Sequence, residues 1–262
     1  MYTSIKTSVT GRVATITLNR PEVSNALRYE SYGEVRDAVN QFSADPAIGA
    51  IVITGEGKHF SAGGDILRFK QLIESETYLG AENIVYAGEM TKAIRRSSKP
   101  VIAMVNGVST GAGLSLCLAC DYRIVDSTSR LIMGFIKLGL PGDTGSIYLL
   151  ARMIGVERAS KMMMTGETVQ GEDAVAMGLA TMCAGEGELA KATYDFANQL
   201  AGMPAKAIAR QKKLLAGYFF KDLDAYYEDE ATSMAEASRE PDFAEAVYGF
   251  LERRQPEYNK EA

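Results

Sequence analysis

Residues 99–121, KPVIAMVNGVSTGAGLSLCLACD, limit the possible folds more than any other part of the chain. The segment begins with an apolar run typical of a buried strand, and DYRIV at 121–125 is typical of another strand. Between them, Gly111, Ala112 and Gly113 directly precede an apolar helix. Strands that alternate with helices in this way indicate an α/β fold with a largely parallel sheet.

The N-terminal part of the chain shows the same alternation. RVATITL at 12–18 and AIVITG at 50–55 have strand patterns, and residues 29–43 and 81–97 have helical ones. After about residue 143 the strand pattern weakens. The sequence therefore predicts that most of the sheet is formed before this point.

Helical spacing dominates the C-terminal part. Pro204 suits the first turn of a helix, and further helices are predicted over 222–237 and 242–254. A chain of 262 residues can bury a sizeable core. We predict a core over residues 1–200 and a helical region over residues 201–262.

The composition argues against several classes of partner. A net charge of −5 gives no polycationic surface to follow a phosphate backbone, so we expect no nucleic acid partner. The N-terminus, MYTSIKTSVTGRVATITLNR, lacks the apolar stretch of a signal peptide, and no window of about 18 uninterrupted apolar residues occurs. These patterns predict a cytoplasmic protein without a membrane partner.

The three cysteines and the single histidine restrict the possible chemistry. Cys117 and Cys120 have CxxC spacing, but they lie in an apolar run without a second pair, which favours buried thiols over a metal or redox site. His59 cannot form a histidine-rich metal site by itself. We expect no metal, and we assign proton transfer near neutral pH mainly to carboxylates, tyrosines or lysines.

Two glycine-rich turns are candidate ligand sites. HFSAGGDI at 59–66 and NGVSTGAGLSLCLACD at 106–121 each place small residues next to an acid or a helix. Small residues let the backbone approach a ligand, and N–H groups at the start of a helix can hold an anion. Neither turn has the GxxxxGK[ST] or GxGxxG pattern of a nucleotide site. Either one alone is equally consistent with a tight turn packed against a sheet.

Four segments together resemble a known family by their order and spacing. They are NRPEVSNAL (19–27), FSAGGD (60–65), the 99–121 segment and GLPGDTG (139–145). This pattern resembles the crotonase superfamily, also called the enoyl-CoA hydratase/isomerase family, and the similarity runs over nearly the whole chain. The resemblance implies a crotonase-like spiral of ββα units, a C-terminal helical trimerisation region, and homotrimers that often pair as hexamers.

The resemblance also implies an acyl-CoA thioester as substrate. By position, the backbone N–H groups of Gly64 and Ala112 would point at the thioester oxygen. Such preformed donors can each lower the barrier to an oxyanion by roughly 3–4 kcal/mol. Coenzyme A would be part of the substrate, and no separate cofactor is expected. Segments that line the CoA groove in the family are matched here by Ala26, Ala62, Asp65 and Ile66.

Two acids of the family's hydratases are missing from this chain. Those enzymes place and protonate water with two glutamates, and the matching positions hold Ser115 and Phe135. A serine near its usual pKa cannot replace an ionised carboxylate as a base at neutral pH. Standard hydration is therefore disfavoured.

Asp143 stands instead where the hydratases usually have a glycine. Dienoyl-CoA isomerases, ring-opening epoxide isomerases of the phenylacetate route and 4-chlorobenzoyl-CoA dehalogenase place an acid there, and the sequence around Asp143 looks most like the last two. The dehalogenase also uses a histidine, whose position is matched here by Gly88. Dehalogenation is therefore disfavoured.

Asp143 has two possible roles. An aspartate ahead of an apolar helix is a normal N-cap, worth roughly 0.5–2 kcal/mol. The family placement and the missing glutamates favour catalysis. The two roles conflict, because a carboxylate that accepts backbone N–H bonds has a lowered pKa and is a poorer base.

We therefore predict an acyl-CoA isomerase in which Asp143 moves a proton, with an acyl group from fatty or aromatic acid metabolism. The alternatives are an enoyl-CoA hydratase or a C–C bond hydrolase in which Asp143 orients water, and a non-catalytic binding protein is less favoured. Phe135, Met133 and Tyr86 suggest an apolar or aromatic acyl pocket. Whether Tyr86, Glu89 or Tyr148 assists catalysis is left open.

Overall fold

The computed structural model describes residues 2–259, and a six-stranded sheet forms its centre. The strand order is β1-β2-β3-β4-β6-β9, with β1 antiparallel to β2 and all the other pairs parallel. A second sheet has the order β5-β7-β8. The largely parallel sheet predicted from the sequence is confirmed. The strands are β1 (Ile5–Thr10), β2 (Val13–Leu18), β3 (Ala50–Gly55), β4 (Val101–Met104), β5 (Val108–Thr110), β6 (Tyr122–Asp126), β7 (Arg130–Ile132), β8 (Thr168–Gln170) and β9 (Met182–Ala184).

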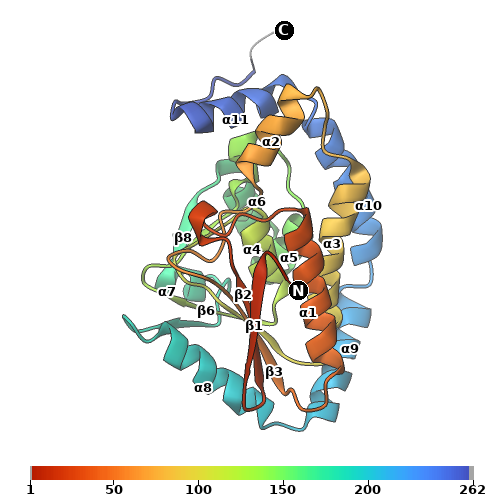
Figure 1. Cartoon of the computed structure of the whole chain (residues 1–262), viewed down its shortest axis with the longest axis vertical. Helices are drawn as coiled ribbons and strands as arrows, with labels where there is room; N and C mark the ends of the chain where they lie inside the picture. The colour runs from red at the N-terminus through yellow and green to blue at the C-terminus, as the bar shows by residue number, and fades with distance from the viewer. Residues whose placement is uncertain (1, 260–262) are drawn as a thin grey trace.

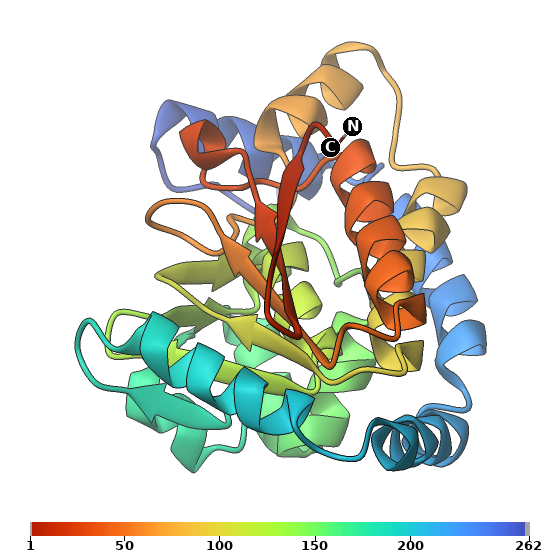
Figure 2. The same ribbon diagram turned by 60° about the horizontal axis from the view of Figure 1, so that its bottom comes forward.

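Helices cover both faces of the main sheet. Helices α1 and α3 lie side by side against one face, and α8 crosses the other (Figure 1; Figure 2). The α-helices are α1 (Tyr29–Ala44), α2 (Ile66–Glu74), α3 (Ala81–Arg96), α4 (Ala112–Ala119), α5 (Ser146–Ile154), α6 (Val156–Thr165), α7 (Gly171–Ala176), α8 (Leu189–Ala201), α9 (Ala205–Phe219), α10 (Leu223–Ala237) and α11 (Pro241–Glu252).

The sequence of strand β3, AIVITG, does not alternate between apolar and polar residues, and its burial explains why. All its residues are buried. Ile51 and Ile53 belong to the main apolar core, whereas Val52 belongs to a second cluster together with Ala197 and Ala201 of α8. Central strands of a parallel sheet read as continuous apolar runs because helices cover both of their faces.

Helix α4 is buried along its whole length, as its apolar sequence predicted. Cys117 lies within it and Cys120 directly follows it, and both thiols are free and buried. Burial raises the pKa of the Cys117 thiol to about 12, so this sulfur stays protonated. The interpretation of the CxxC pair as buried core thiols is confirmed.

The C-terminal helices return to the core. Helix α10 runs along α3, and α11 lies across α2 (Figure 1). Tyr227, Met234 and Phe243 of these helices belong to the same apolar cluster as the main sheet. The division between residues 1–200 and 201–262 stays a prediction, because this single cluster draws on both parts.

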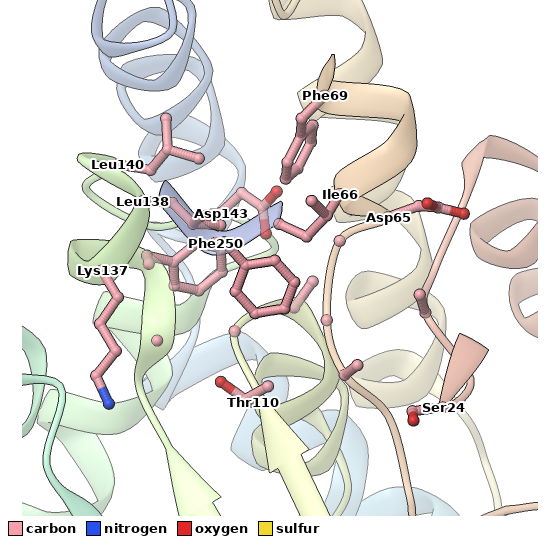
Figure 3. Close-up of a pocket in the computed structure, with 18 of the residues that line it drawn as sticks. Ser24, Asp65, Ile66, Phe69, Thr110, Lys137, Leu138, Leu140, Asp143 and Phe250 are labelled. Atoms are coloured by element: carbon pink, nitrogen blue, oxygen red, sulfur yellow. The ribbon is translucent and has the colours of Figure 1, made fainter. Parts of the chain in front are cut away.

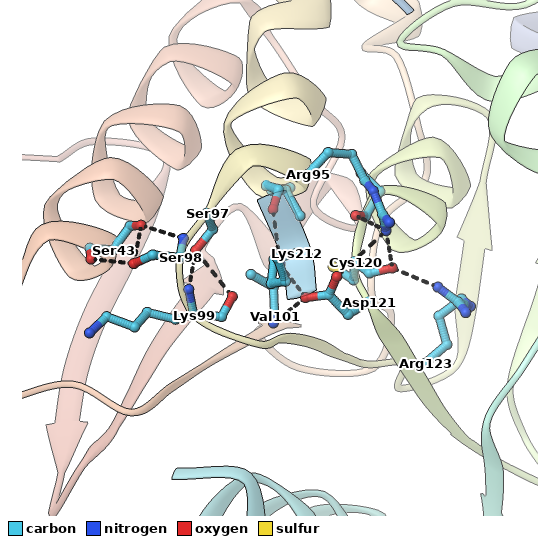
Figure 4. Close-up of polar contacts among 12 residues, drawn as sticks. Ser43, Arg95, Ser97, Ser98, Lys99, Val101, Cys120, Asp121, Arg123 and Lys212 are labelled. Atoms are coloured by element: carbon cyan, nitrogen blue, oxygen red, sulfur yellow. Dashed lines mark hydrogen bonds and ion pairs between the residues drawn. The ribbon is translucent and has the colours of Figure 1, made fainter. Parts of the chain in front are cut away.

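Helix α9 is joined to the sheet by a buried ion pair. Lys212 of α9 contacts the carboxylate of Asp121, which also accepts a hydrogen bond of 2.8 Å from the Val101 N–H (Figure 4). Arg95 of α3 lies 3.7 Å from the other oxygen of Asp121. Burial lowers the pKa of Lys212, and the nearby carboxylate opposes this shift. The contact ties α9 to the start of β4 and β6.

Two features are absent from residues 2–259. No helix is long and apolar enough to cross a membrane. No group of three or more His, Cys, Asp or Glu side chains is placed to hold a metal ion.

Candidate active site

The two glycine-rich turns lie against each other. The Ser61 N–H donates to the Val108 carbonyl at 3.1 Å, and the Thr110 N–H donates back to the Ser61 carbonyl at 3.1 Å. Gly63 has a φ of +84°, and a Cβ built there would lie 2.7 Å from the Thr110 carbonyl oxygen and 3.5 Å from the Ala112 nitrogen. A side chain at residue 63 would be excluded by this approach and by the backbone angle.

Two backbone N–H groups at this junction have no hydrogen-bond acceptor within the described chain. Gly64 lies outside helices and strands, and Ala112 is the first residue of α4, so neither N–H group donates a hydrogen bond within a helix or a strand. The first N–H groups of a helix lack partners inside it and carry its positive partial charge. The predicted oxyanion donors are thus close together and available.

A cavity of about 500 Å³ opens beside these donors. The sequence-predicted residues that line it are Ala26, Ala62, Gly64, Asp65, Ile66, Ala112, Phe135 and Asp143. Apolar side chains from α2, from the segment before α5 and from α11 complete the wall, and the Asp143 carboxylate lies near Phe69 and Ile66 (Figure 3). The structure thus brings all the predicted site residues to one pocket.

Asp143 is not an N-cap in this structure. The N-cap residue of α5 is Gly145, and no side chain forms a capping hydrogen bond to this helix. Asp143 is only 8% exposed, and its Oδ1 accepts a hydrogen bond of 3.1 Å from the Thr144 hydroxyl. The capping role considered from the sequence is therefore wrong.

The surroundings of Asp143 suit proton transfer near neutral pH. Burial raises the pKa of Asp143 from the ordinary 3.8 to about 6, while the Thr144 hydroxyl and the charge of Arg68 act in the opposite direction. A base is most effective when its pKa lies near the working pH. Asp143 can therefore accept a proton and release it again.

The positions that replace the two glutamates carry no carboxylate, and they differ in location. The Ser115 hydroxyl donates to the carbonyls of Gly111 at 3.2 Å and Asp143 at 3.3 Å. It does not line the cavity, whereas Phe135 does. Ser115 therefore holds backbone together, and Phe135 adds apolar surface.

Of the three open aromatic and acidic candidates, none lines this cavity. Tyr86 stacks on Tyr29, with ring centroids 4.1 Å apart, and Glu89 pairs with Lys92 at 2.8 Å. The Tyr148 ring lies under a guanidinium of the same helix. The suggestion that Tyr86 forms part of the acyl pocket is therefore wrong.

Other candidates also have structural roles. Met133 is 1% exposed and is not part of the cavity wall, so its expected place in the acyl pocket is wrong too. His59 Nδ1 accepts a hydrogen bond of 3.2 Å from the Val108 N–H, and burial lowers its pKa. A Cβ at Gly88 would lie 2.6 Å from the Tyr227 ring. The space that a side chain would need at Gly88, which matches the dehalogenase's histidine, is thus occupied by the Tyr227 ring of α10.

Sequence reasoning missed Glu230. This glutamate is 4% exposed, and both of its carboxylate oxygens accept from the Gly145 N–H, at 3.1 and 3.0 Å. It lies on the buried stripe of α10 together with Tyr227 and Met234. The sequence could have pointed to Glu230, because it is an acid on the apolar face of a helix and buried glutamates are rare without a partner.

The chain matches a family model over residues 8–261, and the description of that model is enoyl-CoA hydratase/isomerase. The chain belongs to this family. Its fold agrees with that of a crystal structure of an enoyl-CoA hydratase from Mycobacterium avium subsp. paratuberculosis, with a TM-score of 0.90 and 27% identity over 99% of this chain and 100% of that one. The crotonase fold expected from the sequence is confirmed.

Relatives with assigned names include enzymes of different reactions. A trans-2-decenoyl-[acyl-carrier-protein] isomerase of Streptococcus mutans is 28% identical over 98% of both chains. A 1,2-epoxyphenylacetyl-CoA isomerase of Escherichia coli is 30% identical over 94% of both chains. Membership in the enoyl-CoA hydratase/isomerase family is thus shown, and within this family the reaction depends on the residues of the site.

Proposed function

We propose that this protein is an acyl-CoA isomerase that moves a proton, and with it a double bond, on a CoA thioester. The observation that supports this most strongly is the environment of Asp143. This residue is a buried carboxylate with a pKa of about 6, in the same cavity as two available N–H donors. Ser115 and Phe135 replace the other two acids, and a single carboxylate is sufficient for a proton shuttle.

The proposed step begins with the thioester oxygen against the N–H groups of Gly64 and Ala112. Asp143 takes a proton from the carbon α or γ to the carbonyl, and the electron pair of that C–H bond moves toward the thioester oxygen as an enolate or dienolate forms. The two donors stabilise this developing charge. The neutral Asp143 then returns its proton at a different carbon, which restores the carboxylate.

The cavity wall supports an apolar or aromatic acyl group. Phe69, Leu138, Leu140 and Phe250 surround the space next to Asp143 (Figure 3). Apolar walls around a few placed polar groups are typical of small-molecule sites. Ala26, Ala62, Asp65 and Ile66 also line the cavity, and we place the CoA portion along them.

The thioester carrier needs its own test, because the Streptococcus mutans relative is named for an acyl-carrier-protein substrate. We propose coenzyme A, with no further cofactor, for a cytoplasmic enzyme. A panel of acyl-CoA and acyl-carrier-protein thioesters, followed by mass shift and proton exchange, would identify both the acyl group and the carrier.

The second candidate is an enoyl-CoA hydratase or a C–C bond hydrolase, with Asp143 orienting a water molecule. Incubation with a 2-enoyl-CoA in water enriched in ¹⁸O and in D₂O separates these reactions. Deuterium in the product without ¹⁸O supports isomerisation. Incorporation of ¹⁸O would instead support the addition of water and overturn the isomerase assignment.

We also propose a homotrimer or a hexamer. Helix α9 and the residues next to it carry exposed apolar side chains, Met203, Leu214, Leu215, Tyr218 and Phe219, each at least 45% exposed. Exposed apolar patches mark interaction sites. Mass measurement by light scattering tests this, and a monomer at micromolar concentration would contradict it.

A further inference from the structure

The turn that carries Asp143 is held in an unusual backbone conformation. Thr144 has a φ of +53°, and Gly142 and Gly145 on either side of the Asp143–Thr144 pair have φ values of +140° and +77°. A positive φ is unfavourable for a β-branched residue such as threonine. Such strain persists only where the surrounding structure enforces it, and it is concentrated at functional sites.

The contact that enforces the turn from outside comes from α10. Both carboxylate oxygens of Glu230 accept from the Gly145 N–H, two residues after Asp143. Tyr226, one turn earlier on α10, lies beside Glu230 and acts to lower the pKa of that carboxyl. The hydroxyl of Tyr227 would lie 2.7 Å from a Cβ at residue 145, so α10 packs against the turn too closely for a side chain there.

Glu230 lies behind Asp143 rather than in the pocket. The cavity wall includes Asp143 and, from α10, Met234, but not Glu230. Glu230 therefore does not touch a substrate in the cavity, and any effect it has on the reaction must pass through Asp143 and its turn.

We propose that Glu230 is a positioning residue for Asp143: it anchors the turn that carries the aspartate and shares one buried negative charge with it. This inference rests on the proposed function of Asp143. Two carboxylates in one buried region do not both ionise readily, so the proton is divided between them. Asp143 is the more readily ionised of the two, and Glu230 the more readily protonated.

The electrostatic surroundings agree with this division. Burial, and then the charge of Asp143, raise the pKa of Glu230 to about 8, against the opposing effects of the Gly145 N–H and Tyr226. The pKa of Asp143 stays lower, at about 6. The charged or titratable groups that face the pair are Arg68 from α2, Tyr32 from α1, and Tyr226 and Tyr227 from α10.

A titration tests the shared charge without any assay of activity. The carboxyl groups of Asp and Glu are labelled with ¹³C and followed by NMR in the wild type and in Asp143→Asn. We expect a glutamate that titrates near pH 8 in the wild type, disappears in Glu230→Gln, and shifts to lower pH in Asp143→Asn because its charged neighbour is gone. A Glu230 signal near the ordinary 4.5, or one unchanged by Asp143→Asn, would overturn the shared charge.

Kinetics test the anchoring. Glu230→Gln keeps an acceptor for the Gly145 N–H, whereas Glu230→Leu removes it and leaves the donor unpaired. We expect kcat of Glu230→Leu to fall about 10- to 100-fold at pH 7, because a small displacement of a reacting group has an effect of this order. KM should change little, and Glu230→Gln should stay within about threefold of the wild-type kcat.

The control is Glu236→Gln, an exposed glutamate on the same helix that is expected to behave as wild type. Thermal unfolding shows whether Glu230→Leu folds. Equal kcat for Glu230→Leu and the wild type would overturn the anchoring, and so would an equal loss in both Glu230 variants. If Asp143→Asn is inactive and Glu230→Leu is fully active, only this inference fails. An active Asp143→Asn removes the proposed function instead, and the titration still decides whether the two carboxyls share a charge.

Discussion

The two sides of the pocket are built in different ways. On one side, Gly64 and Ala112 offer backbone N–H groups that are placed by turns and by the start of α4. On the other side, Asp143 projects from a strained turn whose Gly145 N–H is held by Glu230, 85 residues after Gly145 in the chain. The donor side can therefore be recognised from local motifs, whereas the basicity of Asp143 depends on how α10 packs. Variants that change one side and leave the other intact therefore separate the two contributions.

The largest expected effect comes from Asp143→Asn, which removes the base and leaves the N–H donors in place. Turnover should fall by about 10²–10⁴-fold, the usual contribution of general acid–base catalysis. The affinity for a CoA thioester, measured by calorimetry, should change little. Asp229→Asn, at an exposed site on α10, is the matched control. Wild-type turnover in Asp143→Asn would show that Asp143 is not the base.

Ala112→Pro tests the donor side. It deletes one N–H at the first position of α4, where proline is tolerated because that N–H has no partner inside the helix. We expect kcat to fall by about 10²–10³-fold, the loss usual for one oxyanion donor. Ala112→Gly keeps the N–H and should retain most of the activity. Equal activity of the two variants would contradict the oxyanion role.

The pH dependence of the rate examines the acid side. Because the pKa of Asp143 is raised to about 6 and the base must be ionised, kcat should fall as the pH drops below about 6. The measurement is kcat from pH 4.5 to 9 at saturating substrate. A kcat that stays level down to pH 4.5 would show that the pKa of Asp143 is not raised during turnover.

The pH dependence of stability follows from Glu230. Between the ordinary pKa of 4.5 and the folded value of about 8, the unfolded chain has lost the Glu230 proton while the folded chain keeps it. The unfolded state binds fewer protons, so the free energy of unfolding falls as pH rises through this window and levels off above it. The Tm of Glu230→Gln should decline less than that of the wild type between pH 5 and pH 8. Parallel declines would contradict the raised pKa.

The smallest effect concerns the packing of α10 behind the acid side. A Cβ at Gly88 would lie 2.6 Å from the Tyr227 ring, so Gly88→Ala should reduce stability by about 1–3 kcal/mol and lower the Tm by several degrees. Gly217→Ala in α9, where a Cβ would meet nothing within 4 Å, is the control and should leave the Tm unchanged or slightly raised. An unchanged Tm in Gly88→Ala would show that α10 adjusts easily.

Much of the fold could be predicted because its signals are local. The strands at 50–55 and the helix at 29–43 were found within a residue of their observed bounds, since their apolar patterns reflect the faces they bury. Strand β1 and helix α2 were not predicted. Five of the six residues of β1 are exposed, so it lacks the apolar run that marked strands β2, β3, β4 and β6.

The site was predicted unevenly for the same reason. Gly64, Ala112 and Asp143 were found from motifs, and the structure places all of them at one cavity. Tyr86 was misplaced because residue spacing cannot show that its ring stacks on Tyr29. Glu230 was missed because its partner, Gly145, is distant in sequence, and pattern reasoning does not pair such residues.

The central claim, that Asp143 takes a proton from the carbon next to a thioester held by the two N–H groups, can be tested without knowing the acyl group. A saturated acyl-CoA has no double bond to move, so exchange of its α protons in D₂O reports enolate formation alone. Followed by NMR, the wild type should exchange these protons, Asp143→Asn should not, and Ala112→Pro should do so slowly. Exchange by Asp143→Asn at the wild-type rate would contradict the account.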